Sequence, residues 1–319
     1  MPDSSFNTKV YKKQGGNVMV IAEGGQLIAE PGSNIQWGNP TGAADYYVDL
    51  NVSATGDGSL GSPFATIAEA ITASNTSIGL TANRWWARRN RIFVMGDGIA
   101  ESLTVLPEKC DIIGIGSDLY PFPRVTGIHI PAAAKVGCRF INMGFQATGT
   151  AEIFKALAGC HGLSFLGCTF TSTAAGNTKA LALTDCAHVR IEGCNFQPSA
   201  GMAATGLFGL GISIEGTAST HDLYVANNRI FATAGIAIAA GDLNGSVVEN
   251  NVIRAMGAGK ACVDSSNEVA FINNRLMTAI NDLAVASSCT WNAALAVGNL
   301  LNTVQARSAD IPIQVVMTS

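Results

Sequence analysis

A 23-residue repeat of one short segment is the feature that most constrains how this chain folds. The copies begin at residues 223, 246 and 269 and read LYVANNRI, SVVENNVI and VAFINNRL. A fixed period of roughly 20–30 residues is typical of a solenoid, in which successive coils stack on one another. Apolar residues alternate along each copy, as they do in a β-strand that is buried on one face.

The second asparagine of each Asn-Asn pair is expected to face the inside of the solenoid. Parallel strands stack roughly 4.8 Å apart, so equivalent residues of neighbouring coils lie side by side. Inward amides can then hydrogen-bond to one another along the axis, and Asn also tolerates the left-handed backbone of a tight corner. The predicted ladder consists of Asn228, Asn251, Asn274 and Asn299, and the same phase upstream is occupied by Met143, Cys168 and Cys194.

Each repeat also contains a second short apolar segment, which predicts another strand in the same coil. Two or three strands per coil indicate an all-β parallel β-helix, and the frame of a leucine-rich repeat does not occur. The step from Cys194 to Asn228 is 34 residues, which predicts a loop insertion at about residues 199–209. The second strands are expected at residues 180–183, 211–214, 235–238, 261–263 and 283–285.

Charged residues make up only 13% of the 319 residues, about half the usual share, so most of the surface must be polar and uncharged. Two interpretations stay open: a β-helix with a weakly charged exterior that faces solvent, or one that is largely covered by other subunits. The net charge of −4 argues against nucleic acid as a partner. We expect no membrane partner either, since the sequence has neither a membrane helix nor a signal peptide.

The eight cysteines are expected to be free, buried thiols. Cys168 shares a phase with Cys194, and Cys160 shares one with Cys186, so neighbouring coils would bring each pair within disulfide range. However, Cys also packs as a small buried hydrophobe, and a reducing cytoplasm keeps thiols reduced. The sequence has no Cys-x-x-Cys motif, so we expect no metal and no cofactor.

Residues 1–41 do not share the register of the coils, and we expect them to form an arm for attachment and oligomerisation. Their strand-like segments are only three or four residues long, and Gly-Gly and Pro-Gly pairs interrupt them. Strands this short cannot bury a core alone. The alternatives are a flexible tail and an arm that becomes ordered against other chains, and we favour the arm.

The β-helix is expected to cover residues 42–300, followed by a terminating segment at residues 301–319. Near its start, Ser62 is a suitable N-cap, Pro63 fits the first helical position, and Ile67 and Ile71 lie four residues apart on one face. This pattern predicts a helix at about residues 63–74. Such a helix would cover the open edge of the first coil.

Several segments near the start of the β-helix carry a family resemblance. Residues 47–49, 56–59 and 61–67 read YVD, GDGS and GSPFATI, and residues 92–98 and 101–105 continue with IFVMGDG and ESLTV. Together they resemble right-handed parallel β-helix proteins of the pectate-lyase-like superfamily, over about residues 45–300. The resemblance implies a right-handed parallel β-helix, but the superfamily includes lyases, hydrolases, phage tailspikes and inert virion proteins.

Residues 9–25 separately resemble N-terminal segments of tailed-phage structural proteins. Phage β-helices of this kind are usually trimers. The two resemblances together imply a virion protein that is made in the cytoplasm of a host bacterium, forms a homotrimer and contacts other virion proteins through residues 1–41.

A glycosidase needs two carboxylates across a groove, about 5 Å apart if retaining and roughly 6.5–9.5 Å apart if inverting. The candidate pairs on neighbouring coils are Asp242 with Asp264 and Glu249 with Glu268. Asp is also common at corners after strands, and no Asp-x-Asp or Asp-Asp cluster is present. We therefore favour a protein that is not an enzyme.

The one cluster of cationic and aromatic residues is a candidate interface between subunits, because Arg and Trp are enriched at interface hot spots. A solvated loop and a sugar-binding site are the alternatives. The cluster consists of Arg84, Trp85, Trp86, Arg88 and Arg89.

Our first hypothesis is therefore a non-enzymatic bacteriophage structural protein that decorates the capsid or projects from the virion. The second is a receptor-binding tailspike that degrades host surface polysaccharide, and the third is a free polysaccharide lyase. A depolymerising tailspike usually has a longer β-helix than this chain can form.

Overall fold

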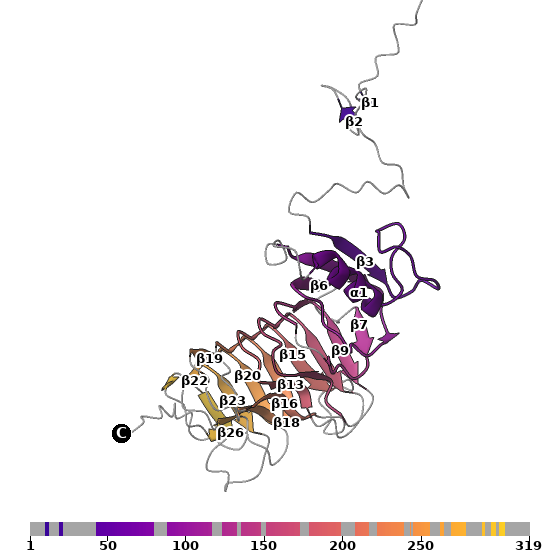
Figure 1. Cartoon of the computed structure of the whole chain (residues 1–319). Coiled ribbons are helices and arrows are strands. Elements are labelled where there is room, and N and C mark those ends of the chain that lie inside the picture. The colour runs from indigo at the N-terminus through magenta and orange to yellow at the C-terminus, as the bar shows by residue number, and fades with distance from the viewer. Residues whose placement is uncertain are drawn as a thin grey trace, which may run out of the picture. The chain divides into compact units, whose positions relative to one another are not determined.

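The computed structural model divides the chain into two compact units, Met1–Gly38 and Asn39–Ser319. In the first unit, β1 (Val10–Lys12) and β2 (Met19–Ile21) form an antiparallel pair (Figure 1). The structure describes residues 10–12, 19–21, 43–79, 88–116, 123–132, 135–147, 151–172, 179–198, 208–216, 222–238, 243, 245–255, 262–264, 269–278, 289–290, 295–297 and 300–303.

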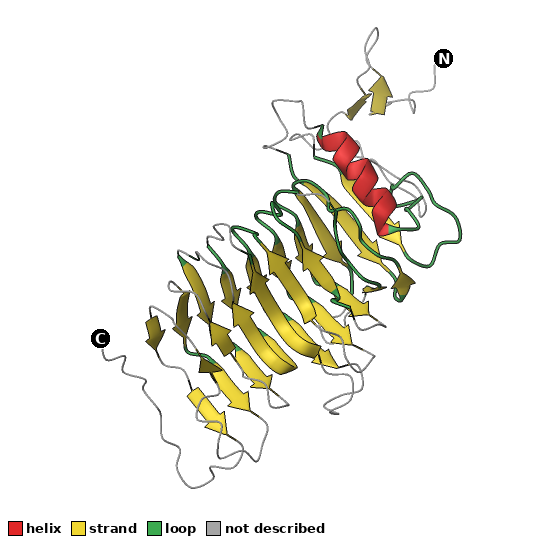
Figure 2. Ribbon diagram, turned by 60° about the horizontal axis from the view of Figure 1, so that its bottom comes forward, coloured by secondary structure: helices red, strands yellow, loops and turns green. Residues whose placement is uncertain are grey.

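The second unit is a parallel β-helix, as the repeat predicts, and its coils stack along one axis (Figure 2). One face is a 10-stranded sheet in which every strand pairs in parallel with the equivalent strand of the next coil. Its strands are β3 (Asp45–Asp49), β4 (Asn90–Met95), β6 (Cys110–Gly114), β8 (Arg139–Ile141), β11 (Ser164–Leu166), β14 (Arg190–Glu192), β17 (Tyr224–Ala226), β19 (Ser246–Glu249), β22 (Val269–Ile272) and β25 (Leu295–Val297).

The second face follows a corner in each coil. Its strands are β5 (Ile99–Ala100), β7 (Arg124–Thr126), β9 (Gly144–Ala147), β12 (Thr169–Ser172), β15 (Asn195–Pro198), the first part of β18 (Arg229–Ile238), β20 (Val252–Ala255), β23 (Arg275–Thr278) and β26 (Leu300–Thr303).

The third face is joined to the second through β18, whose first residues pair with β20 and whose last residues pair with β21. At the end of the predicted insertion at residues 199–209, Phe208 and Gly209 belong to a strand, whereas residues 199–207 lie outside the described residues, as does the predicted strand at 283–285. The strands of this face are β10 (Phe154–Ala156), β13 (Lys179–Thr184), β16 (Phe208–Glu215), the last part of β18, β21 (Cys262–Asp264) and β24 (Cys289–Thr290).

The helix α1 (Ile67–Ile78) packs against β3 and β4, but its predicted start is wrong. Its N-cap is Thr66, which forms a capping box with Glu69, rather than Ser62. The helix cannot begin at Pro63, because the Phe64 backbone is extended and its N–H donates to the Tyr47 carbonyl at 2.9 Å. Ile67 and Ile71 are both buried, so the apolar face of the helix closes the first coil.

A carboxylate from the second face completes the N-terminus of this helix. The two Glu101 oxygens accept hydrogen bonds from the backbone N–H groups of Ile67 and Ala68, at 3.0 and 2.7 Å. Burial raises the pKa of Glu101, while these two hydrogen bonds favour its ionised form. The free N–H groups of the first turn are thereby satisfied, which ties the capping helix to the second face.

The core consists of columns of equivalent side chains along the axis. Phe145, Phe170 and Phe196 stack face to face, with ring centroids 5.2 and 4.7 Å apart. In the later coils the same column continues with Ile230, Ile253 and Leu276, all fully buried. The column of aliphatic side chains in the repeat and the column of phenylalanines upstream therefore form one continuous core.

Six of the eight cysteines are described as free thiols, and all six are buried. Burial raises the pKa of Cys110 and of Cys186 to about 12, so neither carries a thiolate at neutral pH. The side chains of Cys262 and Cys289 lie outside the described residues.

Candidate functional site

The structure places the asparagine column inside the solenoid as a hydrogen-bonded ladder. Asn228 Nδ2 donates to Asn251 Oδ1 at 3.0 Å, and Asn251 Nδ2 donates to Asn274 Oδ1 at 2.9 Å. Each of these oxygens also accepts from a backbone N–H, that of Asn228 at 2.9 Å and that of Asn251 at 3.0 Å. The three asparagines are at most 1% exposed, so their amides stabilise the stack from inside. Asn299 lies outside the described residues.

The left-handed corner is made by the residue before the ladder, which corrects the role we assigned to the column. Asn227, Asn250 and Asn273 have φ of 58°, 53° and 53°. The first asparagine of each pair therefore turns the backbone at the surface, while the second holds the interior. Both roles suit Asn, because its short amide tolerates positive φ and both donates and accepts hydrogen bonds.

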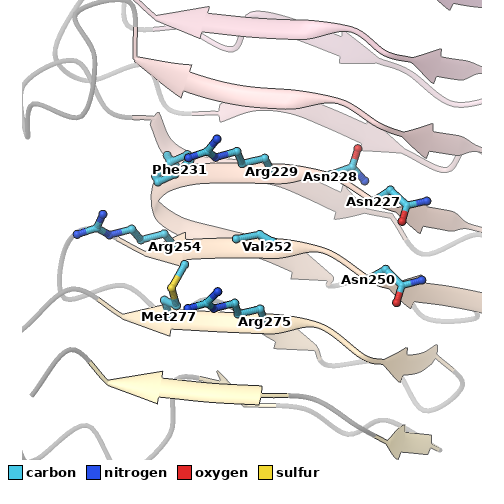
Figure 3. Close-up of a pocket in the computed structure, with 9 residues that line it drawn as sticks. All are labelled: Asn227, Asn228, Arg229, Phe231, Asn250, Val252, Arg254, Arg275 and Met277. Carbon is cyan, nitrogen blue, oxygen red and sulfur yellow. The ribbon is translucent and has the colours of Figure 1, made fainter. Parts of the chain in front are cut away.

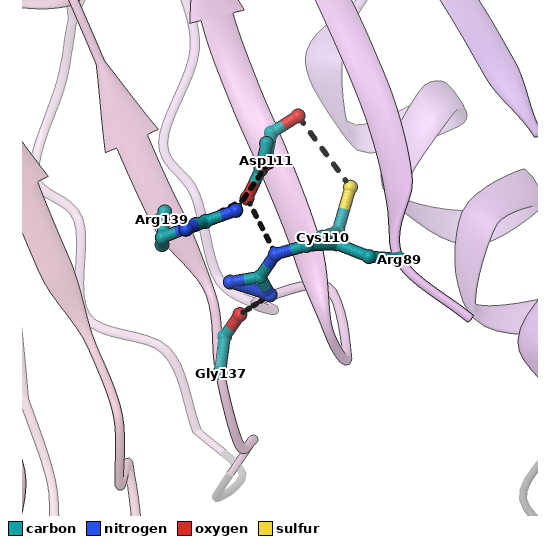
Figure 4. A network of polar contacts seen from close by, with 5 residues as sticks. All are labelled: Arg89, Cys110, Asp111, Gly137 and Arg139. Carbon is teal, nitrogen blue, oxygen red and sulfur yellow. Dashed lines mark hydrogen bonds and ion pairs between the residues drawn. The ribbon is translucent and has the colours of Figure 1, made fainter. Parts of the chain in front are cut away.

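Two residues of the predicted interface cluster make contacts within their own chain. Arg88 donates from Nη1 to the Ser77 carbonyl at 2.9 Å, at the end of α1. Arg89 donates from Nη1 to the Gly137 carbonyl at 2.8 Å and pairs with Asp111 at 3.0 Å (Figure 4). Arg84, Trp85 and Trp86 lie outside the described residues.

Asp111 is the centre of a structural ion network on the outside of the first face. It also accepts a bidentate pair of bonds from Arg139, at 2.6 and 2.7 Å, and its side chain is only 10% exposed. Burial lowers the pKa of Arg89, whereas the hydrogen bonds to Asp111 raise that of Arg139. The network ties the segment after the helix to two coils, which accounts for Arg89 without a partner subunit.

The candidate catalytic pairs cannot be assembled from the described side chains, because Asp242 and Glu268 lie outside the described residues. Asp264 belongs to β21 on the third face. Glu249, at the end of β19 on the first face, accepts a hydrogen bond from the Tyr224 hydroxyl at 2.5 Å, and this bond raises the pKa of Tyr224. Glu249 is thus used in a cross-coil contact.

An open groove lies on the second face of the β-helix. It has a volume of about 420 Å³ and is formed by β18, β20 and β23 of three successive coils (Figure 3). Its lining comprises Asn227, Asn228, Arg229, Phe231, Asn250, Val252, Arg254, Arg275 and Met277. These residues include three arginines and no carboxylate.

Strand register places the arginines of this groove in two rows. Arg229, Val252 and Arg275 are direct neighbours across the strands, and Phe231, Arg254 and Met277 form the row two residues further on. Sequence reasoning missed this site. The signal was present, since Arg229 and Arg275 occupy the same phase two repeats apart.

A different observation bears on membrane and metal sites. No helix in the described part of the chain is long and apolar enough to cross a membrane. Among the same residues, no three His, Cys, Asp or Glu side chains are grouped so that they could hold a metal ion.

Residues 158–276 match the protein family described as the right-handed β-helix region. The matched segment runs from the coil that contains β11 to the coil that contains β23, so it covers the ladder and the groove. Neither the curated proteins nor the solved structures yield a match to this chain. The comparison therefore supports the fold and leaves the function to be argued from the residues.

Proposed function

We propose that this protein is a non-enzymatic structural component of a bacteriophage virion, a trimeric β-helix that decorates the capsid or projects from the particle. The observation that carries the proposal is the division of the chain into a short N-terminal unit, Met1–Gly38, and a separate β-helix. An arm for attachment followed by a rigid rod is an arrangement that suits a particle-bound protein.

The bonding of described acidic side chains supports a structural role. Asp111 binds Arg89 and Arg139, Glu101 caps the helix, and Glu249 accepts from Tyr224. A catalytic acid needs a pKa tuned to its task and access to a substrate. These carboxylates instead hold coils together.

Exposed apolar side chains in the first coils support the proposal that other subunits cover part of the β-helix. A contiguous exposed apolar patch marks protein contacts, and we propose that these side chains contribute to such a surface. They are Val105, Ile115, Ile128, Ile130 and Val136, with exposed fractions of 43, 50, 37, 37 and 38%.

The test is to locate the protein on purified particles by imaging and to repeat the experiment after deletion of residues 1–41. We expect a trimer by light scattering, and we expect the deletion to leave a folded β-helix that no longer attaches to particles. A monomeric full chain would contradict the proposal. So would release of oligosaccharides from host polysaccharide that Asp242→Asn with Asp264→Asn eliminates, since that result identifies an enzyme.

A further inference from the structure

Cys168 and Cys194 lie side by side in neighbouring coils, inside the β-helix. The strands on either side of them fix this register, because β11 pairs with β14 before the cysteines and β12 pairs with β15 after them. Neighbouring parallel strands are roughly 4.8 Å apart, and the Cα atoms of a disulfide are about 4.4–6.8 Å apart. The backbone therefore already holds the two residues at a distance that a disulfide can span.

The two thiols also contact each other. The Cys194 thiol donates to the Phe165 carbonyl at 3.3 Å, and this carbonyl belongs to the coil of Cys168. Burial raises the pKa of Cys194, and its hydrogen bond with the Cys168 thiol raises this pKa further. The Cys168 thiol itself donates to the Phe140 carbonyl at 3.4 Å. To bond with Cys194, the Cys168 sulfur has to give up this one weak hydrogen bond.

The corner outside this pair is formed by glycine in both coils. Cys168 follows Gly167 and Cys194 follows Gly193, and both glycines are exposed and left-handed, with φ of 62° and 65°. A Cβ atom placed on Gly167 would meet nothing within 4 Å. The two cysteines are 0 and 2% exposed, so a small reagent can reach them only through local opening, which a glycine corner favours.

The corners beside the other stacked thiols differ. Cys110 and Cys138 are also neighbours in register, but Arg89 lies against the residue before Cys138 and donates to its carbonyl at 2.8 Å. In a third pair, Cys186 follows Asp185 instead of a glycine. Of the three pairs whose side chains the structure describes, the pair in the asparagine column is therefore the one with bare glycine corners in both coils.

We propose that Cys168 and Cys194 form a site of oxidative modification, at which hydrogen peroxide closes a disulfide between two coils. The thiolate of one cysteine attacks a peroxide oxygen and becomes a sulfenic acid, and the released hydroxide takes up the thiol proton to form water. The second thiol attacks the sulfenic sulfur and forms the S–S bond, while its proton leaves with the hydroxyl group as a second water. Two thiols are thereby oxidised to one disulfide, and one peroxide is reduced to two waters.

The link would be absent in a reducing compartment and would form after the protein leaves it. It closes a loop that contains a whole coil of chain, so it restricts the unfolded chain and stabilises the β-helix. It also lies next to the first amide of the ladder, because the Cys194 N–H donates to Asn228 Oδ1 at 2.8 Å. The oxidised site would therefore hold the earlier coils together covalently where the hydrogen-bonded ladder begins.

The experiment exposes the purified full chain to hydrogen peroxide and measures its intact mass and a peptide map without reductant. We expect the loss of two hydrogen atoms and a cross-linked peptide that contains Cys168 and Cys194. Cys168→Ala should abolish this peptide, whereas the matched control Cys110→Ala, which removes a buried thiol of a covered pair, should retain it. Oxidation of the wild type should raise Tm by about 5 °C, and dithiothreitol should reverse the rise.

Two results would overturn the inference. In the first, peroxide leaves Cys168 and Cys194 as thiols or converts them to sulfinic acids without a link. In the second, the link forms only between other cysteines, such as Cys262 and Cys289, which are also neighbours in register. The inference goes beyond the virion proposal and does not depend on it, since a protein that forms the link but is absent from particles would refute only the virion role.

Discussion

The same inward column is built from two different chemistries in the two halves of the β-helix. In the earlier coils it holds Cys168 and Cys194, whose thiols donate to the carbonyls of Phe140 and Phe165 at 3.4 and 3.3 Å. In the later coils the amides of Asn228, Asn251 and Asn274 donate to the equivalent carbonyls of Ile191, Val225 and Val248, at 2.9, 2.9 and 2.8 Å.

The difference lies in what the side chain can accept. An amide oxygen also accepts a hydrogen bond from the backbone N–H of the preceding coil. Each asparagine can therefore both donate hydrogen bonds to and accept them from neighbouring coils. A thiol is a weak donor and a weak acceptor, and it packs as a small hydrophobe beside the stacked phenylalanines. The two halves meet at Cys194, whose N–H donates to Asn228 Oδ1 at 2.8 Å. The same inward position of the coil can therefore hold either a thiol or an amide.

The largest effect is expected from breaking the amide half with Asn251→Leu. The change leaves the Val225 carbonyl and the Asn228 N–H without their bonds in a fully buried site. Each such group costs about 1–3 kcal/mol, so the free energy of unfolding should fall by about 4 kcal/mol. Chemical denaturation measures it.

The control for this prediction is Asn250→Gly. It alters the neighbouring corner residue, whose positive φ glycine adopts readily, and it should change stability by less than about 1 kcal/mol. Equal losses in Asn250→Gly and Asn251→Leu would argue against the division of roles between the two asparagines.

A second expected effect lies in the earlier coils and depends on pH. His129 is fully buried beside Phe145 and Phe154, and its Nδ1 accepts from the Leu103 N–H at 3.1 Å. Burial lowers its pKa from 6.5 to about 4. Because the folded pKa lies below the unfolded one, the stabilisation is complete above pH 6.5 and is lost as the pH falls towards 4, by about 3 kcal/mol in total.

The measurement is the unfolding free energy of the wild type and of His129→Leu between pH 7 and pH 4. The variant lacks the titrating group, so its stability should fall less steeply over that window than that of the wild type. If the unfolding free energies of the two proteins changed in parallel with pH, His129 would not be the source of this pH dependence.

A smaller loss is expected from Cys168→Ala in the thiol half. The sulfur is fully buried and donates one weak hydrogen bond, so its removal leaves a small cavity. We expect a loss of about 1.5 kcal/mol by urea denaturation, well below that of Asn251→Leu. A loss as large as that of Asn251→Leu would mean that the thiols bond the coils as strongly as the amides do.

The period and alternation of the repeat were sufficient to predict the parallel β-helix. The inward position of Asn251 could be predicted for the same reason, because asparagine at one phase of three successive repeats implies stacking. The helix start could not, since Ser62 and Pro63 satisfy local capping rules while the strand bonds of Phe64 override them. Tertiary pairing decides such a boundary, and a single sequence does not display it.

The groove was harder to predict than the ladder. Arg229 and Arg275 share a phase, but Arg254 occupies the next row, and Val252 interrupts the first. Only the strand register brings the three arginines onto one surface. In the cluster near Arg89 the charges are adjacent in sequence, and its described members Arg88 and Arg89 make bonds within the chain that the sequence does not display.

The most direct test of the shared column is to replace a thiol by an amide with Cys194→Asn. In this position the new amide can donate to the Phe165 carbonyl and to Asn228 Oδ1, and so extend the ladder by one coil. The comparison is Cys160→Asn, at a buried cysteine outside the column, where we expect an amide to find no equivalent partners. We predict that Cys194→Asn changes the unfolding free energy by less than about 1 kcal/mol, whereas Cys160→Asn lowers it by about 3 kcal/mol. Equal destabilisation by the two substitutions would contradict the account.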